Sequence, residues 1–295
     1  MSTLKERHKR INLGRICRLF GVTRQSYYQH FWNEATVSFE QELIVKQVIK
    51  IRQKHRRIGG RKLYELLEPF MLEHQIKMGR DALFDVLASN GLLVKRRKRR
   101  VFTTQSFHWL RKYSNLIRDY NPEEPNRIWV SDITYWKIGS GFIYISFITD
   151  AYSHKIVGYH VADTLEAIET LKALRMALST LRRTPIGLIH HSDRGIQYCS
   201  SNYVNLLLQH KIRISMTESS DPLENPIAER VNGIIKNEYL DCYQVESLPE
   251  ARELLDQVII LYNDERPHMS IGNLTPVKVH NGSHIPENLW KKAKM

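Results

Sequence analysis

Cysteine is scarce in this chain, and its scarcity narrows the possible classes of protein. Only three of the 295 residues are cysteines, and they lie far apart: Cys17, Cys199 and Cys242. No Cys-x-x-Cys pair is present, so a zinc finger is not supported. We expect all three to be small, buried hydrophobic residues of a protein in a reducing compartment.

Long apolar runs are also missing. No stretch approaches the roughly 20 residues needed to span a bilayer. The first eight residues carry charges but lack the apolar segment of a signal peptide. We therefore expect a soluble intracellular protein. Internal repeats and low-complexity segments are absent from the sequence as well.

Positive charge is abundant but unevenly distributed. The chain has 44 Lys and Arg against 31 Asp and Glu, a net charge of +13, which favours a polyanionic partner. Residues 1–118 hold 26 basic and 9 acidic residues, whereas residues 119–295 hold 18 and 22. This asymmetry predicts a basic DNA-binding arm ahead of a catalytic core with an acidic site. The alternative is a basic tail that only aids solubility.

The first helical region is predicted within residues 1–35. Apolar residues at helical spacing end at Gly21, and Thr23 can cap a second helix over residues 24–31. A helix, a glycine-containing turn and a helix form the outline of a helix-turn-helix. Its second helix would present two polar side chains to DNA, Arg24 and Gln25. A helical hairpin that does not bind DNA is the alternative.

A second helix-turn-helix unit is expected over residues 36–100. Apolar stripes predict one helix through Ile51, another ending near Pro69 and a third from about Gly79 to Asn90. Six consecutive basic residues close the unit: Lys95, Arg96, Arg97, Lys98, Arg99 and Arg100. Such a run is typical of a segment that faces phosphates, and also of a flexible charged linker.

The periodicity changes after residues 101–125, which are predicted to be a linker because prolines near its end discourage regular structure. Residues 126–285 are predicted to form an α/β core, and residues 286–295 a tail. The expected order is strands 128–138, 142–149 and 154–161, helix 165–181, strand 187–190, helix 201–210, strand 212–216, and helices 226–241 and 249–262.

Three acidic residues of this core indicate its chemistry: Asp132, Asp193 and Glu229. Asp132 lies in an apolar strand, where an unpartnered charge is costly to bury. Asp193 follows a short apolar strand, at the kind of strand end where open α/β sheets bind ligands. Glu229 lies one turn into a helix, and 35 residues separate it from Asp193. Each could instead have a structural role, in a strand end, a turn or a salt bridge.

Together, the three carboxylates predict a metal site. They would repel one another unless cations joined them, and Mg²⁺ prefers such oxygen ligands. Two such ions can drive in-line attack on a phosphodiester. Lys236 lies two helical turns after Glu229 and could reach a phosphate, or remain a solvated lysine. Arg266 and His268 are expected to contact DNA, or else to belong to a packed turn.

Four sequence blocks surround these residues. They are Trp129-Val-Ser-Asp132-Ile-Thr-Tyr135, His191-Ser-Asp193-Arg-Gly195-Ile-Gln-Tyr198, Glu224-Asn-Pro-Ile-Ala-Glu229-Arg-Val-Asn232-Gly-Ile-Ile-Lys236-Asn-Glu238, and Tyr262-Asn-Asp-Glu-Arg266-Pro-His268 followed by Thr275-Pro276. In these blocks the chain resembles the DDE integrase-core transposases, in particular the second-frame product (OrfB) of the IS-three (IS3) family of bacterial insertion sequences. The segment from Arg56 to Tyr64 also resembles the helix-turn-helix upstream of that core.

The resemblance implies an RNase H-like integrase catalytic core preceded by all-α helix-turn-helix DNA-binding domains. It implies cleavage and joining of DNA strands at insertion-sequence ends by Asp132, Asp193 and Glu229, with two Mg²⁺ ions for which Mn²⁺ can substitute. The implied partners are double-stranded DNA, further copies of this chain in at least a dimer, and the upstream-frame protein (OrfA) as a separate chain or a fusion. The implied location is the bacterial cytoplasm, at the nucleoid.

Other functions could use the same residues. An RNase H-like nuclease would use the same three carboxylates without strand transfer, and a DNA-binding repressor would not cleave at all. A serine or tyrosine recombinase needs a covalent protein nucleophile, and the 14 tyrosines do not exclude one by composition. The basic helical region ahead of the core favours a recombinase, because cutting at a chosen sequence requires DNA recognition.

Overall fold

The computed structural model describes residues 12–118 except 96–108, residues 120–218 except 140, and residues 224–282. The chain divides into two compact units, one of residues 1–51 with 66–93, the other of residues 52–65 with 94–295. Among the described residues, no helix is both long enough and apolar enough to cross a membrane.

Helices make up the first unit. They are α2 (Leu13–Leu19), α3 (Arg24–Lys54), α4 (Gly60–Glu73) and α5 (Arg80–Ser89), and α3 and α4 continue into the second unit. Gly21 adopts a left-handed backbone (φ 66°) between α2 and α3, where glycine has no steric penalty. The Thr23 hydroxyl accepts a hydrogen bond from the Ser26 N–H at 3.0 Å, which confirms the predicted cap.

Two helix boundaries differ from the prediction. The single helix α3 crosses residue 35, where a domain boundary was expected, because no glycine or proline interrupts residues 24–54. The helix α4 continues past Pro69 to Glu73. Pro69 lies on the exposed side, while Leu67 and Met71 keep the apolar face buried, so packing outweighs the lost backbone hydrogen bond.

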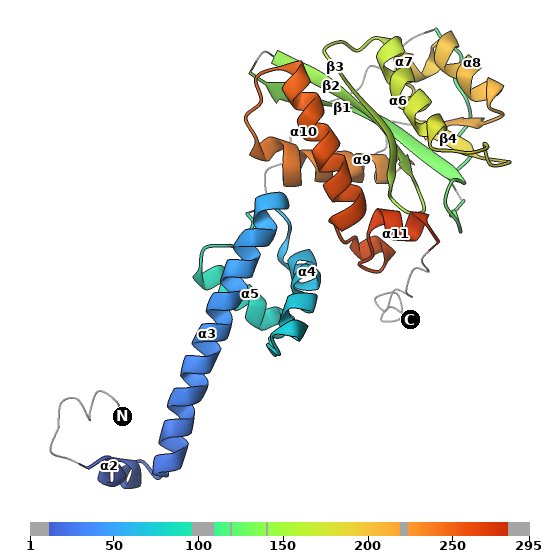
Figure 1. The fold of residues 1–295 in the computed structure, drawn as a ribbon. Coiled ribbons are helices and arrows are strands. Elements are labelled where there is room, and N and C mark those ends of the chain that lie inside the picture. Colours follow the sequence, from blue (N-terminus) through green and yellow to red (C-terminus); the bar gives the residue numbers. More distant parts are fainter. Residues whose placement is uncertain (1–11, 96–108, 119, 140, 219–223, 283–295) are drawn as a thin grey trace. The chain divides into compact units, whose positions relative to one another are not determined.

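A five-stranded mixed sheet forms the centre of the second unit (Figure 1). Its strands are β1 (Ile128–Ile138), β2 (Gly141–Asp150), β3 (Ile156–Ala162), β4 (Ile189–Ser192) and β5 (Arg213–Met216). The order is β3-β2-β1-β4-β5, with β1, β2 and β3 antiparallel and with β4 and β5 parallel to β1. All five predicted strands are confirmed, and the fold is the expected RNase H-like core.

Helices cover both faces of this sheet, because successive side chains of a strand point to opposite faces. One face packs against α6 (Ala167–Ser179), α7 (Ile196–Cys199) and α8 (Ser201–Gln209), and the other against α9 (Pro226–Ile234) and α10 (Leu248–Ile260). At Gly158 a Cβ atom would lie 2.3 Å from the Ala173 carbonyl oxygen, so glycine permits the close approach of α6 to β3.

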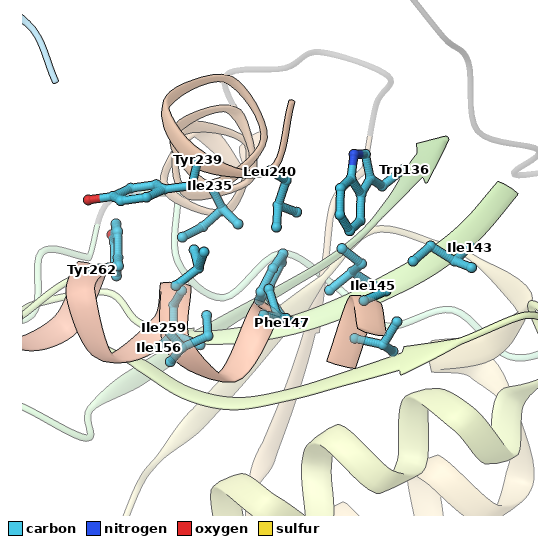
Figure 2. Close-up of a cluster of buried hydrophobic side chains, with 14 of the residues drawn as sticks. Trp136, Ile143, Ile145, Phe147, Ile156, Ile235, Tyr239, Leu240, Ile259 and Tyr262 are labelled. Carbon is cyan, nitrogen blue, oxygen red and sulfur yellow. The ribbon is translucent and has the colours of Figure 1, made fainter. Parts of the chain in front are cut away.

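The two C-terminal helices end in wider turns. A π-helix, η2 (Ile235–Tyr239), and a 3-10 turn, η3 (Leu240–Cys242), follow α9, and a second π-helix, η4 (Leu261–Glu265), follows α10. Figure 2 shows side chains from both π-helices, Ile235, Tyr239 and Tyr262, in one apolar core with Phe147 of the sheet. The described chain closes with η5 (Met269–Ile271) and α11 (Pro276–His280).

Two of the three cysteines are buried as predicted. These are Cys17 and Cys199, whereas Cys242 is only half-buried. Residues 283–295, which include the predicted tail, lie outside the described residues.

Candidate active site

Asp132 lies on β1, and Asp193 directly follows β4, the neighbouring parallel strand. The register of β1 and β4 pairs Ile128 with Ile189 and Val130 with His191, and the same register carried two residues further brings Asp132 opposite Asp193. Every second residue of a strand faces the same side of the sheet. Ile128, Val130 and Ile189 pack against Ala228 of α9, so the residues at the same alternation, Asp132 and Asp193, are expected on that side. The sheet therefore presents the two carboxylates together on the face that α9 covers.

The helix α9 places Glu229 above this pair. Pro226 occupies the first turn, where its missing N–H costs nothing. Two asparagines attach the helix to β1: the Asn225 amide donates to the Ser131 carbonyl oxygen at 2.9 Å, and the Asn232 amide donates to Asp132 Oδ2 at 2.7 Å. Glu229 lies one turn before Asn232 and is exposed. Asp193 and Glu229 are both near enough to Asp132 for their charges to raise the pKa of its carboxyl group.

The electrostatics of Asp132 reflect this crowding of like charge. Burial and, after it, the nearby Asp193 and Glu229 carboxylates together raise the pKa of the Asp132 carboxyl to about 7, against hydrogen bonds from the Ile133 N–H and the Asn232 amide. Asp193 Oδ1 accepts a hydrogen bond from the Gly195 N–H at 3.0 Å, which holds the turn after β4. Negative charge is therefore concentrated around Asp132.

The donor chemistry of this site suits a hard divalent cation, since carboxylate oxygens are its preferred ligands and like charges are already gathered. Within the described residues, however, no three His, Cys, Asp or Glu side chains stand close enough to hold one ion as they are. Ligation of one ion by all three carboxylates therefore requires side-chain rearrangement.

The two histidines before Asp193 are buried and structural. His190 Nε2 lies 2.9 Å from the Tyr203 hydroxyl and 3.2 Å from the Ser131 hydroxyl. His191 Nδ1 lies 2.8 Å from the Ser215 hydroxyl, and Nε2 lies 3.0 Å from the Glu224 carbonyl oxygen. Burial lowers the pKa of His190 to about 3 and of His191 to about 4, so both are neutral at pH 7.

Lys236 lies at the start of η2, next to β1. Its ammonium group donates to the Tyr135 carbonyl oxygen at 2.7 Å and lies 4.7 Å from the centre of the Tyr135 ring. Burial lowers the pKa of this half-buried lysine. Lys236 therefore contacts β1 at Tyr135, three residues beyond Asp132 on the same strand.

Arg266 and His268 are not placed to contact DNA directly, contrary to the sequence-based expectation. Arg266 is 1% exposed and donates from Nε and Nη2 to the two oxygens of Glu238, each at 2.8 Å. His268 is buried, and burial together with the charge of Arg266 strongly lowers its pKa. The packed-turn alternative fits this segment, because the chain turns back after η4 and His268 pairs with Leu274 in an antiparallel bridge.

The other candidate DNA contacts lie near the beginning of the chain. Arg24 and Gln25 are exposed in the first turn of α3, as a recognition helix requires. The Lys95 side chain is exposed, and its backbone carbonyl accepts a hydrogen bond from Arg57 Nη2 at 2.8 Å. Arg96, Arg97, Lys98, Arg99 and Arg100 lie outside the described residues.

Sequence reasoning missed several residues around the site. Glu238 closes the sequence block that holds Glu229 and Lys236, but no role for it followed from that pattern. Lys62 donates to Glu238 Oε1 at 2.8 Å from a position 176 residues earlier in the chain, a pairing that no local pattern predicts.

The integrase core domain family matches residues 122–222, and a second integrase core domain family matches residues 210–276. Together they span the sheet and the three carboxylates. Among solved structures, the HTLV-2 integrase catalytic core domain in complex with magnesium aligns with 54% of this chain and 99% of its own, at 22% identity and a TM-score of 0.43.

Curated relatives match almost the whole chain. The "Insertion element IS600 uncharacterized 31 kDa protein" of Shigella sonnei is 33% identical over 91% of this chain and 98% of its own length. The "Transposase for insertion sequence element IS629" of the same species is 27% identical over 94% of each chain. "Transposase InsF for insertion sequence IS3A" of Escherichia coli is 26% identical over 94% of this chain and 96% of its own. The chain therefore belongs to the IS3-family insertion-sequence transposases with an integrase core.

Proposed function

We propose that this chain cleaves and joins DNA strands at the ends of its insertion sequence, using Asp132, Asp193 and Glu229 with two Mg²⁺ ions, for which Mn²⁺ can substitute. One observation carries the proposal. Asp132 lies on β1, Asp193 directly follows the neighbouring parallel strand β4, and Asn232 ties the helix that bears Glu229 to Asp132. No other group of acidic residues in the described part of the core combines this placement with a carboxyl pKa raised to about 7.

Divalent ions bound there would activate a water or a DNA 3′-hydroxyl for attack and stabilise the leaving oxygen. The residues of the chain supply placement. Asn232 orients one oxygen of Asp132, the Gly195 N–H orients one oxygen of Asp193, and Lys236 supplies a positive charge beside β1 for a DNA phosphate. Water first frees a 3′-hydroxyl at an element end, and that hydroxyl then attacks a second phosphodiester.

Three buried tyrosines of the core are poorly suited to a covalent mechanism. Tyr198, Tyr203 and Tyr262 are all buried, and burial raises the pKa of each phenol. A nucleophilic tyrosine would need an accessible hydroxyl and a base to activate it. Nucleophilic water and DNA hydroxyls suit the carboxylate site better.

The proposed partner is double-stranded DNA, both element ends and target. Arg24, Gln25 and the basic run Lys95–Arg100 are the proposed contacts of the basic arm, because exposed basic residues neutralise phosphates. Two element ends must meet during joining, so we propose at least a dimer. OrfA is proposed as a further partner, either as a separate chain or as a fusion.

A direct test uses the full-length chain and a duplex carrying the terminal sequence of its insertion element. Incubation with Mg²⁺ should yield nicked and joined strands on a denaturing gel, and a chelator should abolish both products. A pre-cleaved end separates the functions, because a transposase joins it whereas a simple nuclease does not. Nicking without joining would reject strand transfer, and binding without either product would support the repressor alternative.

A further inference from the structure

A second polar cluster, which includes none of the three active-site carboxylates, lies in the same unit. Glu238 accepts three charge-assisted hydrogen bonds of 2.8 Å, one from Arg266 Nε, one from Arg266 Nη2 and one from Lys62 Nζ. The side chains of Lys62 and Glu238 are 16% and 18% exposed, and that of Arg266 is 1% exposed. All three residues belong to the second compact unit. We name them the Glu238 cluster.

The two cations of the cluster stabilise the charged form of Glu238. Burial alone would raise the pKa of Glu238, but the hydrogen bonds and charges of Arg266 and Lys62 lower it overall. Glu238 likewise raises the pKa of Arg266 in spite of burial. A carboxylate with two buried or half-buried cations and a two-pronged arginine contact is held in one orientation.

Both ends of the Arg266–Glu238 pair lie at π-helical turns. Glu238 is within η2, and Arg266 directly follows η4, where its backbone N–H bonds to the Leu261 carbonyl oxygen five residues back at 3.0 Å. Such turns are rare, are less favourable than a plain α-helix, and occur often at functional sites. Tyr239 and Tyr262 pack in the same core beside them (Figure 2). Side-chain contacts must therefore hold these turns in place.

The π-helix η2 makes polar contacts with two different parts of the unit. Its first part carries Lys236, whose ammonium group reaches the Tyr135 carbonyl oxygen on β1 at 2.7 Å. Two residues later, Glu238 reaches the cations of the Glu238 cluster. The extra residue of a π-turn offsets the two sides of a helix by about 100°, the rotation of one residue. If η2 relaxed to an α-helix, Lys236 and Glu238 could not both keep these partners.

We propose that Glu238, held by Arg266 and Lys62, is a positioning residue that fixes η2 and thereby keeps Lys236 beside β1 for a DNA phosphate. This inference rests on the proposed function, since it assigns a further residue to the same reaction. Glu238 itself does not touch the reacting atoms. Lys62 gives the cluster a second consequence, because the segment of residues 52–65 then helps to build the catalytic unit.

The test uses the full-length chain with Glu238→Gln, and Glu253→Gln as the matched control on the exposed side of α10. Without DNA, the reactivity of Lys236 toward an amine-acylating reagent is followed by peptide mass spectrometry. We expect Glu238→Gln to raise the labelling rate several-fold and the control to leave it unchanged. In Mg²⁺-dependent cleavage we expect kcat to fall about 10- to 100-fold, as for a misplaced group, with the Kd for DNA unchanged.

Lys62→Met is the milder variant and keeps the Arg266–Glu238 pair, so it covers the case in which Glu238→Gln does not fold. It should change Lys236 labelling and kcat in the same direction by a smaller factor. Wild-type labelling and wild-type kcat in whichever variant is folded would overturn the proposal and leave Glu238 a purely stabilising role. A response of Lys236 labelling, with cleavage that does not depend on Asp132, would instead reject the proposed function alone.

Discussion

Asp132 of the active site and Glu238 of the Glu238 cluster are buried to a similar degree, but the first has acidic neighbours and the second has basic ones. Asp132 is half-buried beside Asp193 and Glu229, and its pKa rises to about 7. Glu238 is half-buried between Arg266 and Lys62, and its pKa is lowered. Burial favours the neutral form of both carboxyl groups, so the neighbours alone decide the difference.

This difference separates a site for ligands from a structural contact. An acid matched by cations needs no further partner, and it holds secondary structure in place. Carboxylates that lie close together repel one another, and a bound cation reduces this repulsion. Removing a carboxylate should therefore have opposite effects on stability at the two places.

The largest effect is expected in catalysis. Asp132→Asn, Asp193→Asn and Glu229→Gln should each lower Mg²⁺-dependent cleavage about a thousandfold or more, because metal stabilisation of the transition state supplies several kcal/mol. Binding to the end duplex, measured by fluorescence anisotropy, should persist. Asp163→Asn, an exposed aspartate after β3, is the control. Normal turnover in any of the three variants would remove that residue from the site.

The next effect concerns the matched cluster. Arg266→Met leaves Glu238 half-buried with Lys62 alone, and breaking a buried pair in this way costs about 3–5 kcal/mol. Urea unfolding should show this loss. Lys46→Met removes an exposed pair with Glu42 and should leave the free energy of unfolding nearly unchanged. If Arg266→Met changed the free energy of unfolding as little as Lys46→Met, Arg266 would not be needed to stabilise Glu238.

A smaller effect is expected from pH on the metal-free protein. The folded chain keeps a proton on Asp132 up to about pH 7, whereas the ordinary pKa of the group is 3.8. Folding therefore takes up a proton between these values, so stability falls as pH rises through this window. Relative to Asp132→Asn, the wild type should lose on the order of 2 kcal/mol between pH 4 and pH 8, allowing for its partial exposure.

Thermal unfolding across that pH range provides the measurement. Added Mg²⁺ at pH 8 should raise the Tm of the wild type and not of Asp132→Asn, because only a folded, charged site binds the ion. If the stability of the two proteins changed equally from pH 4 to pH 8, the pKa of Asp132 would not be raised in the folded state.

The smallest effect is expected in the salt dependence of DNA binding, which should differ between exposed basic residues and basic residues held in ion pairs. Arg24→Gln, or a single neutral substitution within Lys95–Arg100, should lower the slope of log K against log salt by about 0.9 for each DNA phosphate that the protein no longer neutralises. Lys62→Met should leave that slope unchanged, because its charge is used in the Glu238 cluster. An unchanged slope for Lys95–Arg100 would identify that run as a linker only.

Much of the fold could be predicted from local sequence patterns. Alternating β-branched and aromatic residues located β1 and β2, and the sequence block around each carboxylate indicated the site, because both signals are carried by adjacent residues. The turn capped by Thr23 was likewise predicted from neighbours alone. Two helix boundaries were predicted wrongly. At Pro69, packing of the apolar face of α4 outweighed a local helix-breaking residue. In α3, no glycine or proline interrupts the helix where the boundary was expected.

The sequence by itself determined the order of strands and helices and the identity of three acidic residues that belong together. Only the tertiary structure decided that Arg266 is buried against Glu238 and that Lys62, from the basic arm, joins them. The reason is physical: a charged side chain has the same local pattern whether it faces water, DNA or a counterion. Its partner is chosen by chain segments that meet only when the sheet and its helices pack.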